Sequence, residues 1–276
     1  MEIRYLADPI RFQRMTTTEL RQNLLVEKLF HTGELRLVYS EIDRAIVGAA
    51  VPSSEPLALS GSKELAADYF TERREIGIIN IGAPGIVLVG EESFHLGNKE
   101  ALYIGKGRHS IEFRSDSAQT PAEFYLLSYP AHQAYPTRKV TREQANRLDL
   151  GSDAECNKRT IFQYLRPGVL DTCQLVMGLT ELAEGSVWNT MPPHTHERRT
   201  EIYMYFEMPE NGIVFHFCGA PDTTRHIVMH NKQIVLSPSW SIHAGVGTAR
   251  YTFIWGMGGE NQEFNDMDGV DPTQIQ

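Results

Sequence analysis

Short apolar runs separated by turn residues make up most of the chain, and this pattern is typical of an all-β protein. From residue 75 onward the runs follow one another closely, with glycine, proline or asparagine between them. Runs of this length and spacing predict the strands of a β-sandwich or jelly roll. The strands expected on this basis cover residues 35–39, 45–49, 76–81, 85–89, 93–96, 101–104, 109–113, 122–128, 160–165, 173–182, 186–190, 201–208, 213–218, 225–229, 233–236 and 251–256.

A few segments have helical patterning instead, and each is short. Thr16 and Glu19 have the spacing of a capping box, and leucines follow at helical intervals as far as residue 29. A second short helix is expected at 62–70. Residues 141–148 begin with another capping-box pair and are polar, so we expect a connecting helix there.

Two stretches resemble each other loosely, one on each side of this connecting segment. Residues 96–110 and 229–243 both contain a polar turn, a short apolar strand, a tight turn and a histidine. Such internal similarity indicates two related β-domains in tandem. We therefore expect an N-terminal domain at 1–150 and a C-terminal domain at 151–276.

Composition narrows the classes of partner. The 276 residues carry 26 Lys and Arg against 35 Asp and Glu, a formal net charge of −9, so we expect neither nucleic acid nor a membrane as a partner. No apolar run approaches the ~20 residues of a membrane span, and the first residues lack the pattern of a signal peptide. Cys156, Cys173 and Cys218 have no paired spacing, so we expect reduced, packed thiols and a cytoplasmic protein.

One histidine-rich segment indicates a specific chemistry. His194 and His196 stand two residues apart, and on a strand such residues share one face. Alone, this pair is compatible with ordinary packed or surface histidines. Glu201 beyond a short turn and His243 after the proline-bounded turn at 238–242 complete a set of three histidines and one carboxylate. Such a set predicts a site for zinc, manganese or iron.

The first half of the chain has no equivalent set. His95 and His109 lack a His-x-His pair and a carboxylate at the matching distance. We expect both to be structural, so the N-terminal domain is predicted to have no metal ligands and the C-terminal domain to hold the metal.

The spacing of these residues resembles the two metal motifs of the cupin superfamily. His-x-His-x4-Glu at 194–201 is similar to the first motif, and Pro-x-x-x-x-His at 238–243 to the second, with Trp240 in place of the usual glycine. A wider resemblance to the 5-keto-4-deoxyuronate isomerase family of this superfamily runs nearly from end to end. The segments that carry it are 12–15, 96–105, 191–196 and 256–262.

This resemblance implies two tandem cupin domains, each a jelly-roll barrel, with a few short helices. It also implies a homohexamer with one zinc ion per chain, held by His194, His196, Glu201 and His243. The implied reaction is a ketol isomerisation in pectin and uronate catabolism. It converts 5-dehydro-4-deoxy-D-glucuronate, a small keto-uronate, to 3-deoxy-D-glycero-2,5-hexodiulosonate, with the metal as a Lewis acid.

The other groups of the site stay open at this point. Tyr203 shares the strand parity of Glu201 and should enter the same barrel interior, and Glu260 lies in a glycine-rich stretch after a strand. Arg159 is our candidate for the substrate carboxylate, because a guanidinium fork matches a carboxylate. Each of these residues has an ordinary structural role as its alternative. Further candidates are Tyr205, His216, His230, Gln262, Lys158 and Arg166, whereas Arg198 and Arg199 are expected to face solvent.

Other functions fit the same ligands. One is an isomerase of the same superfamily that acts on 5-deoxy-glucuronate from inositol catabolism. Another is an iron-dependent cupin dioxygenase, which would bind iron and consume oxygen. A non-enzymatic sugar-sensing cupin has less support, because the sequence shows no DNA-binding module.

Overall fold

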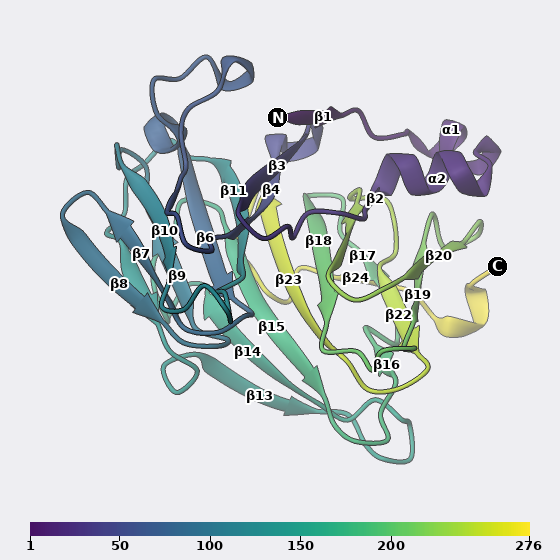
Figure 1. The fold of residues 1–276 in the computed structure, drawn as a ribbon. Helices are drawn as coiled ribbons and strands as arrows, with labels where there is room; N and C mark the ends of the chain where they lie inside the picture. The colour runs from purple at the N-terminus through teal and green to yellow at the C-terminus, as the bar shows by residue number, and fades with distance from the viewer. The chain divides into compact units, whose positions relative to one another are not determined.

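A computed structural model describes all residues from 1 to 276, and strands dominate it (Figure 1). The prediction of an all-β protein is confirmed. Helical structure is limited to two short α-helices and four 3-10 turns, and no helix is long and apolar enough to cross a membrane. These elements are α1 (Pro9–Arg14), α2 (Thr17–Leu24), η1 (Ile42–Arg44), η2 (Lys63–Leu65), η3 (Phe70–Glu72) and η4 (Pro272–Gln274).

The chain forms two compact units that interleave along the sequence. Unit 1 contains Met1–Arg4, Lys28–Ala145 and Tyr164–Val176, and unit 2 contains Tyr5–Glu27, Asn146–Gln163 and Met177–Gln276. This division differs from a single boundary at residue 150. The N-terminal helices belong to unit 2 because the strand after them, β2 (Leu25–Val26), pairs with β21 (Gln233–Ser237).

Unit 1 consists of a seven-stranded and a four-stranded sheet. Buried apolar side chains from both sheets form its core. The larger sheet has the order β1 (Glu2–Arg4), β3 (Glu34–Ser40), β4 (Ile46–Val51), β11 (Phe124–Pro130), β6 (Arg74–Asn80), β9 (Ala101–Ile104) and β12 (Arg138–Val140). The smaller sheet has the order β5 (Leu57–Ala58), β10 (Ile111–Ser115), β7 (Gly85–Val89) and β8 (Glu92–Leu96).

Unit 2 repeats this plan with a seven-stranded and a four-stranded sheet of its own, and adds the short pair β17 (His194–Thr195) and β24 (Asp268–Gly269). The larger sheet has the order β13 (Asn146–Leu150), β14 (Arg159–Leu165), β15 (Val176–Leu182), β23 (Thr252–Gly259), β18 (Arg199–Phe206), β21 and β2. The smaller sheet has the order β16 (Trp188–Asn189), β22 (Ala244–Gly247), β19 (Val214–Cys218) and β20 (Arg225–Met229).

The matching strand orders allow the two units to be compared residue by residue. In unit 2, Glu201 on β18 pairs with Ser237 on β21, whereas the corresponding pair in unit 1 is Ile76 on β6 with Ile104 on β9. Both isoleucines are fully buried members of the apolar core of unit 1. The position that carries a carboxylate in unit 2 is therefore a packed aliphatic side chain in unit 1.

The predicted helices agree with the structure only in part. The Thr16–Glu19 capping box is present, but α2 ends at Leu24 because the next residues pair as β2. The helix predicted at 62–70 is wrong, since that region contains η2 and the start of η3.

The helix predicted at 141–148 is also wrong. Thr141 N–H donates to Gln144 Oε1 across a single turn, and β13 then begins. The polar composition reflects the position of β13 at the edge of its sheet, where all of its side chains are partly or fully exposed. α1 was not predicted, although Asp8 as N-cap followed by Pro9 is a recognisable start signal.

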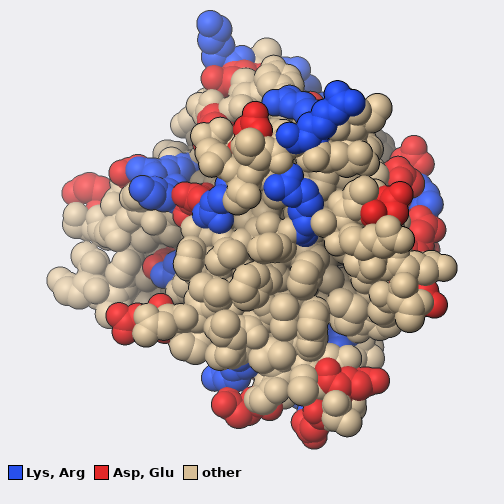
Figure 2. Space-filling view, turned by 90° about the vertical axis from the view of Figure 1, so that its right-hand side faces the viewer, with Lys and Arg blue, Asp and Glu red and all other residues tan.

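The cysteines and the surface charge complete the description. All three cysteines are free, as predicted, but only Cys218 is fully buried and Cys156 is exposed, so the prediction of packed thiols is wrong for Cys156. On the face shown in Figure 2, acidic and basic side chains are interspersed around a largely uncharged central area.

Candidate metal centre

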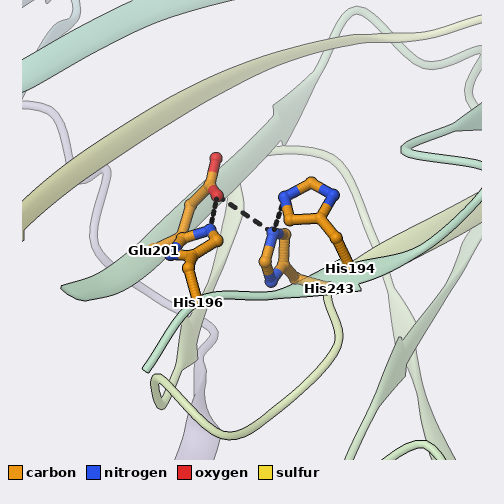
Figure 3. Close-up of side chains that lie close together, drawn as sticks. All are labelled: His194, His196, Glu201 and His243. Atoms are coloured by element: carbon orange, nitrogen blue, oxygen red, sulfur yellow. Dashed lines mark hydrogen bonds and ion pairs between the residues drawn. The ribbon is translucent and has the colours of Figure 1, made fainter. Parts of the chain in front are cut away.

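The four predicted ligands come from neighbouring segments of unit 2. His194 lies on β17 and His196 directly follows it, Glu201 lies on β18, and His243 immediately precedes β22. Figure 3 shows the three imidazole rings and the carboxylate turned toward one another. Their candidate ligand atoms all lie within 4.8 Å of one another. The structure thus brings together residues that span 50 positions of the sequence.

Glu201 and His243 connect the members of this cluster. Glu201 Oε2 lies 2.9 Å from His196 Nε2 and 3.0 Å from His243 Nε2. His243 Nε2 also lies 3.0 Å from His194 Nε2 (Figure 3). One imidazole N–H cannot point at two acceptors at once, so His243 cannot satisfy both neighbours by hydrogen bonding.

A divalent cation fits this donor set. His243 Nδ1 lies 3.3 Å from the Ser241 carbonyl oxygen, and an N–H there leaves the lone pair of Nε2 free for a metal. Three imidazole nitrogens and one carboxylate oxygen are then directed at one place. Such a mixed nitrogen and oxygen set suits zinc and related transition metals.

Burial and neighbouring groups shift the pKa of two members of the cluster, His194 and Glu201. His196, Glu201 and His243 are each at most 5% exposed. Burial and the neighbouring His243 lower the pKa of His194 to about 3, so its ring is neutral near pH 7. Burial alone would raise the pKa of Glu201, but attraction to His243 and the hydrogen bonds of both histidines outweigh it and hold that pKa well below its usual range. Neutral imidazole and ionised carboxylate are the forms that bind metal.

A cavity of about 260 Å³ opens beside the cluster. His194, His196 and Glu201 contribute to its wall, and most of the remaining wall is apolar. The other lining residues are Leu150, Arg159, Ile161, Thr180, Thr190, Met191, Pro192, Arg199, Tyr203, Phe253, Trp255, Met257, Phe264 and Met267.

The tyrosines expected inside the barrel are both buried, in different surroundings. Tyr203 lines the cavity, its hydroxyl lies 2.9 Å from Thr190 Oγ1, and its ring meets the ring of His243 edge-on at 5.5 Å. Burial raises the pKa of Tyr203 well above its usual range. Tyr205 does not line the cavity, and its hydroxyl lies 2.8 Å from His216 Nδ1. His216 is fully buried behind the site, and burial lowers its pKa to about 3.

The remaining candidates divide between the cavity and the surface. Arg159 lines the cavity and is half-buried. Glu260 is exposed and does not line the cavity, and His230 and Lys158 are exposed as well.

The segment that follows β23 nevertheless covers the site. It contributes Phe264 and Met267 to the cavity wall, and β24 pairs with β17 so that His194 lies opposite Gly269. Arg198 fixes this segment by two hydrogen bonds to the Asp266 carboxylate and one to Asp268.

The position of Arg199 differs from the prediction. It was expected to face solvent, yet it is 1% exposed and lines the cavity. The signal was available, because Arg199 lies two residues before Glu201 on β18 and therefore shares its inward face. Arg198, the residue before it, has the opposite parity and stays partly exposed.

Comparisons with known proteins identify the family of the chain. A model described as the KduI/IolB family matches residues 24–271. The chain is 49% identical over 275 residues to the 4-deoxy-L-threo-5-hexosulose-uronate ketol-isomerase of Caldicellulosiruptor bescii and 50% identical over 277 residues to the protein of that name from Yersinia pseudotuberculosis, with 100% of both chains covered each time. An IolB-like protein from Salmonella typhimurium LT2 has a similar fold, with a TM-score of 0.73 and 14% identity over 90% of this chain and 97% of that one. The chain belongs to the KduI/IolB family.

Proposed function

We propose that the chain is a metal-dependent ketol-isomerase that converts 5-dehydro-4-deoxy-D-glucuronate to 3-deoxy-D-glycero-2,5-hexodiulosonate in pectin and uronate catabolism. The observation that carries this proposal is the buried cluster of three histidines and Glu201 on the wall of a cavity. Identity of about half of all positions to relatives named as uronate ketol-isomerases supports the substrate.

His194, His196, Glu201 and His243 would hold one divalent cation per chain, and we propose zinc. The donor set supports zinc, and zinc has no redox chemistry of its own, which suits an isomerisation. When bound, the cation supplies Lewis acidity that polarises a carbonyl group.

The protein side chains around the cluster have separate tasks. Tyr203 lines the cavity beside the metal ligands, and its hydroxyl contacts Thr190, another lining residue. We propose that this hydroxyl donates a hydrogen bond to a substrate oxygen. The apolar wall, including Phe264 and Met267 from the covering segment, excludes water and strengthens these polar contacts.

The resemblance stated above supports three further parts of this proposal. They are a homohexameric assembly, a cytoplasmic location and a metal site confined to the second of two cupin domains. The apolar packing of Ile76 at the position that corresponds to Glu201 supports the last of these.

Turnover of two linear acids tests the proposal. We expect the purified protein to isomerise 5-dehydro-4-deoxy-D-glucuronate at least tenfold faster than 5-deoxy-glucuronate, with no consumption of oxygen. Preference for 5-deoxy-glucuronate would favour the inositol-pathway isomerase. Bound iron with oxygen uptake would identify a dioxygenase, and either result would overturn the proposal.

A further inference from the structure

Arg199 is a buried cation with an unsatisfied donor. Its side chain lines the cavity, and its Nε–H has no hydrogen-bond partner although the residue is only 1% exposed. A charged group buried without full pairing is costly to the folded protein. The cost of burying the Arg199 guanidinium is offset if a bound ligand accepts the hydrogen bond that its Nε–H lacks.

The partners that Arg199 does have are weak and uncharged. Its Nη1 donates to Asn261 Oδ1 at 3.4 Å, and its Nη2 donates to the Asp266 carbonyl oxygen at 3.2 Å. The first distance exceeds the usual range for an N–H···O bond, and the second lies at its upper limit. These contacts hold the guanidinium through two of its nitrogens and leave the third, Nε, without a partner beside the cavity wall.

The nearby carboxylates are occupied by other residues. The Asp266 carboxylate accepts hydrogen bonds from Arg198 and from Asn261 Nδ2. Glu201 Oε2 faces His196 and His243. Glu201 is also the only acidic residue that lines the cavity, whereas two arginines do so. The cavity is therefore suited to an anionic ligand, and its apolar wall would strengthen a pairing with arginine.

We propose that Arg199 binds the carboxylate of the substrate and so determines that the enzyme accepts acids rather than neutral sugars. This inference rests on the proposed function, in which the substrate is a six-carbon uronate that reacts at C1 and C2. Its carboxylate is C6, about 6 Å from C1 along five extended C–C bonds. Arg199 and Glu201 are two positions apart on β18, so their α-carbons lie about 6.6–6.8 Å apart. This spacing is close to the distance between C1 and C6 of the substrate.

The other cavity arginine is less suited to this role. Arg159 lies on β14, and β15 and β23 separate that strand from β18 in the sheet. Arg159 is only half-buried, and its Nη1 donates to the Asn157 carbonyl oxygen at 2.8 Å. A half-buried guanidinium keeps access to water and does not require a ligand to satisfy it. Arg159 therefore provides a matched control with the same chemistry in the same cavity.

Binding of an unreactive six-carbon aldehyde acid tests this assignment. 6-Oxohexanoate has a C1 carbonyl and a C6 carboxylate but no C2 hydroxyl, so it cannot isomerise, and its methyl ester lacks the charge. Calorimetric titration of the metal-loaded protein should show about 30-fold or more tighter binding of the acid than of the ester, as expected for a desolvated charge pair. Arg199→Met should abolish this ratio, Arg199→Lys should restore part of it, and Arg159→Met should retain most of it.

Two further readouts separate binding from folding. Metal content should equal that of the wild type in Arg199→Met, and its melting temperature should be unchanged or higher, because the variant removes a buried, under-satisfied charge. A structural arginine would instead lower the melting temperature. A retained acid-to-ester ratio in Arg199→Met, or its loss in Arg159→Met alone, would overturn the inference.

Wild-type turnover of the uronate distinguishes this failure from failure of the proposed function. If the wild type turns over the uronate but Arg199→Met leaves the acid-to-ester binding ratio unchanged, only the assignment of Arg199 is overturned. If the wild type does not turn over the uronate but the acid-to-ester binding ratio depends on Arg199, the proposed isomerase activity is overturned. The assignment of Arg199 as a carboxylate-binding residue is then retained.

Discussion

The Tyr203→Phe substitution separates the proposed chemistry of the site from its packing. The ring stays, with its contact to Phe253 at 4.8 Å between centroids, and only the hydroxyl is lost. Its partner Thr190 Oγ1 keeps a second hydrogen bond, from Asn189 Nδ2 at 3.1 Å. The free energy of unfolding should therefore fall by about 0.5–1.5 kcal/mol, the net value of one hydrogen bond. For domains of this size that is a decrease in Tm of a few degrees, about 2–4 °C per kcal/mol.

The effect on catalysis should be much larger. If the Tyr203 hydroxyl donates to a substrate oxygen as charge develops there, its loss should lower kcat by roughly 10²–10³-fold, as for other donors that stabilise an oxyanion. KM and the metal content should change little, because the four ligands and the cavity wall remain. The assay is steady-state isomerisation of the uronate with metal analysis of each preparation.

Tyr205→Phe is the matched control on the same face of β18. Its hydroxyl is the hydrogen-bond partner of His216 Nδ1, and His216 Nε2 has no partner. The variant therefore leaves a buried imidazole unsatisfied and should cost about 1–3 kcal/mol of stability. Because Tyr205 does not line the cavity, kcat should stay within about threefold of wild type. The reasoning is refuted if Tyr203→Phe retains wild-type kcat, or if Tyr205→Phe loses as much activity as Tyr203→Phe.

Two further predictions concern the segment after β23 and the packing around the cavity residue Trp255. Hydrogen bonds from Arg198 lower the pKa of Asp266 to about 2, below an unfolded value near ~3.9, so the pair stabilises the fold fully above about pH 4 and progressively less as pH falls toward 2. The difference in unfolding free energy between wild type and Asp266→Asn, about 1 kcal/mol, should shrink over that window in denaturant titrations; a constant difference would contradict the assignment. In Gly178→Ala the new methyl group would clash with Trp255 Cζ2. The free energy of unfolding should fall by about 1–3 kcal/mol, and the tryptophan fluorescence should change. Gly269→Ala is the control, because its methyl group would meet no atom within 4 Å, and neither quantity should change. Equal stability of these two alanine variants would show that Trp255 does not require the space at Gly178.

The four candidate ligands could be predicted from the sequence because their spacing is a local pattern. The parity of His194 and His196 and the short turn to Glu201 are determined by strand geometry over a few residues. The same parity rule placed Tyr203 correctly. It would also have placed Arg199 inside, but adjacent arginines were interpreted as a surface charge pair, although alternate residues of one strand face opposite sides.

Features that depend on distant pairing were not predictable in the same way. The N-terminal helices belong to unit 2 because of the short ladder between β2 and β21, which no local pattern encodes. The polar edge strand β13 has the composition of an exposed helix, and only its pairing with β14 decides between the two. The orientation of the segment after β23, with Phe264 rather than Glu260 toward the cavity, depends on the ion pairs of Arg198.

Metal removal and restoration tests the central claim most directly. The protein is treated with a chelator, metal per chain is measured, and isomerisation of 5-dehydro-4-deoxy-D-glucuronate is followed before and after addition of zinc, with His196→Ala as the site-directed control. We expect activity to disappear with the metal, to return in proportion to zinc up to one ion per chain, and not to return in His196→Ala. Full activity in a chain free of metal, or full restoration in His196→Ala, would contradict the account.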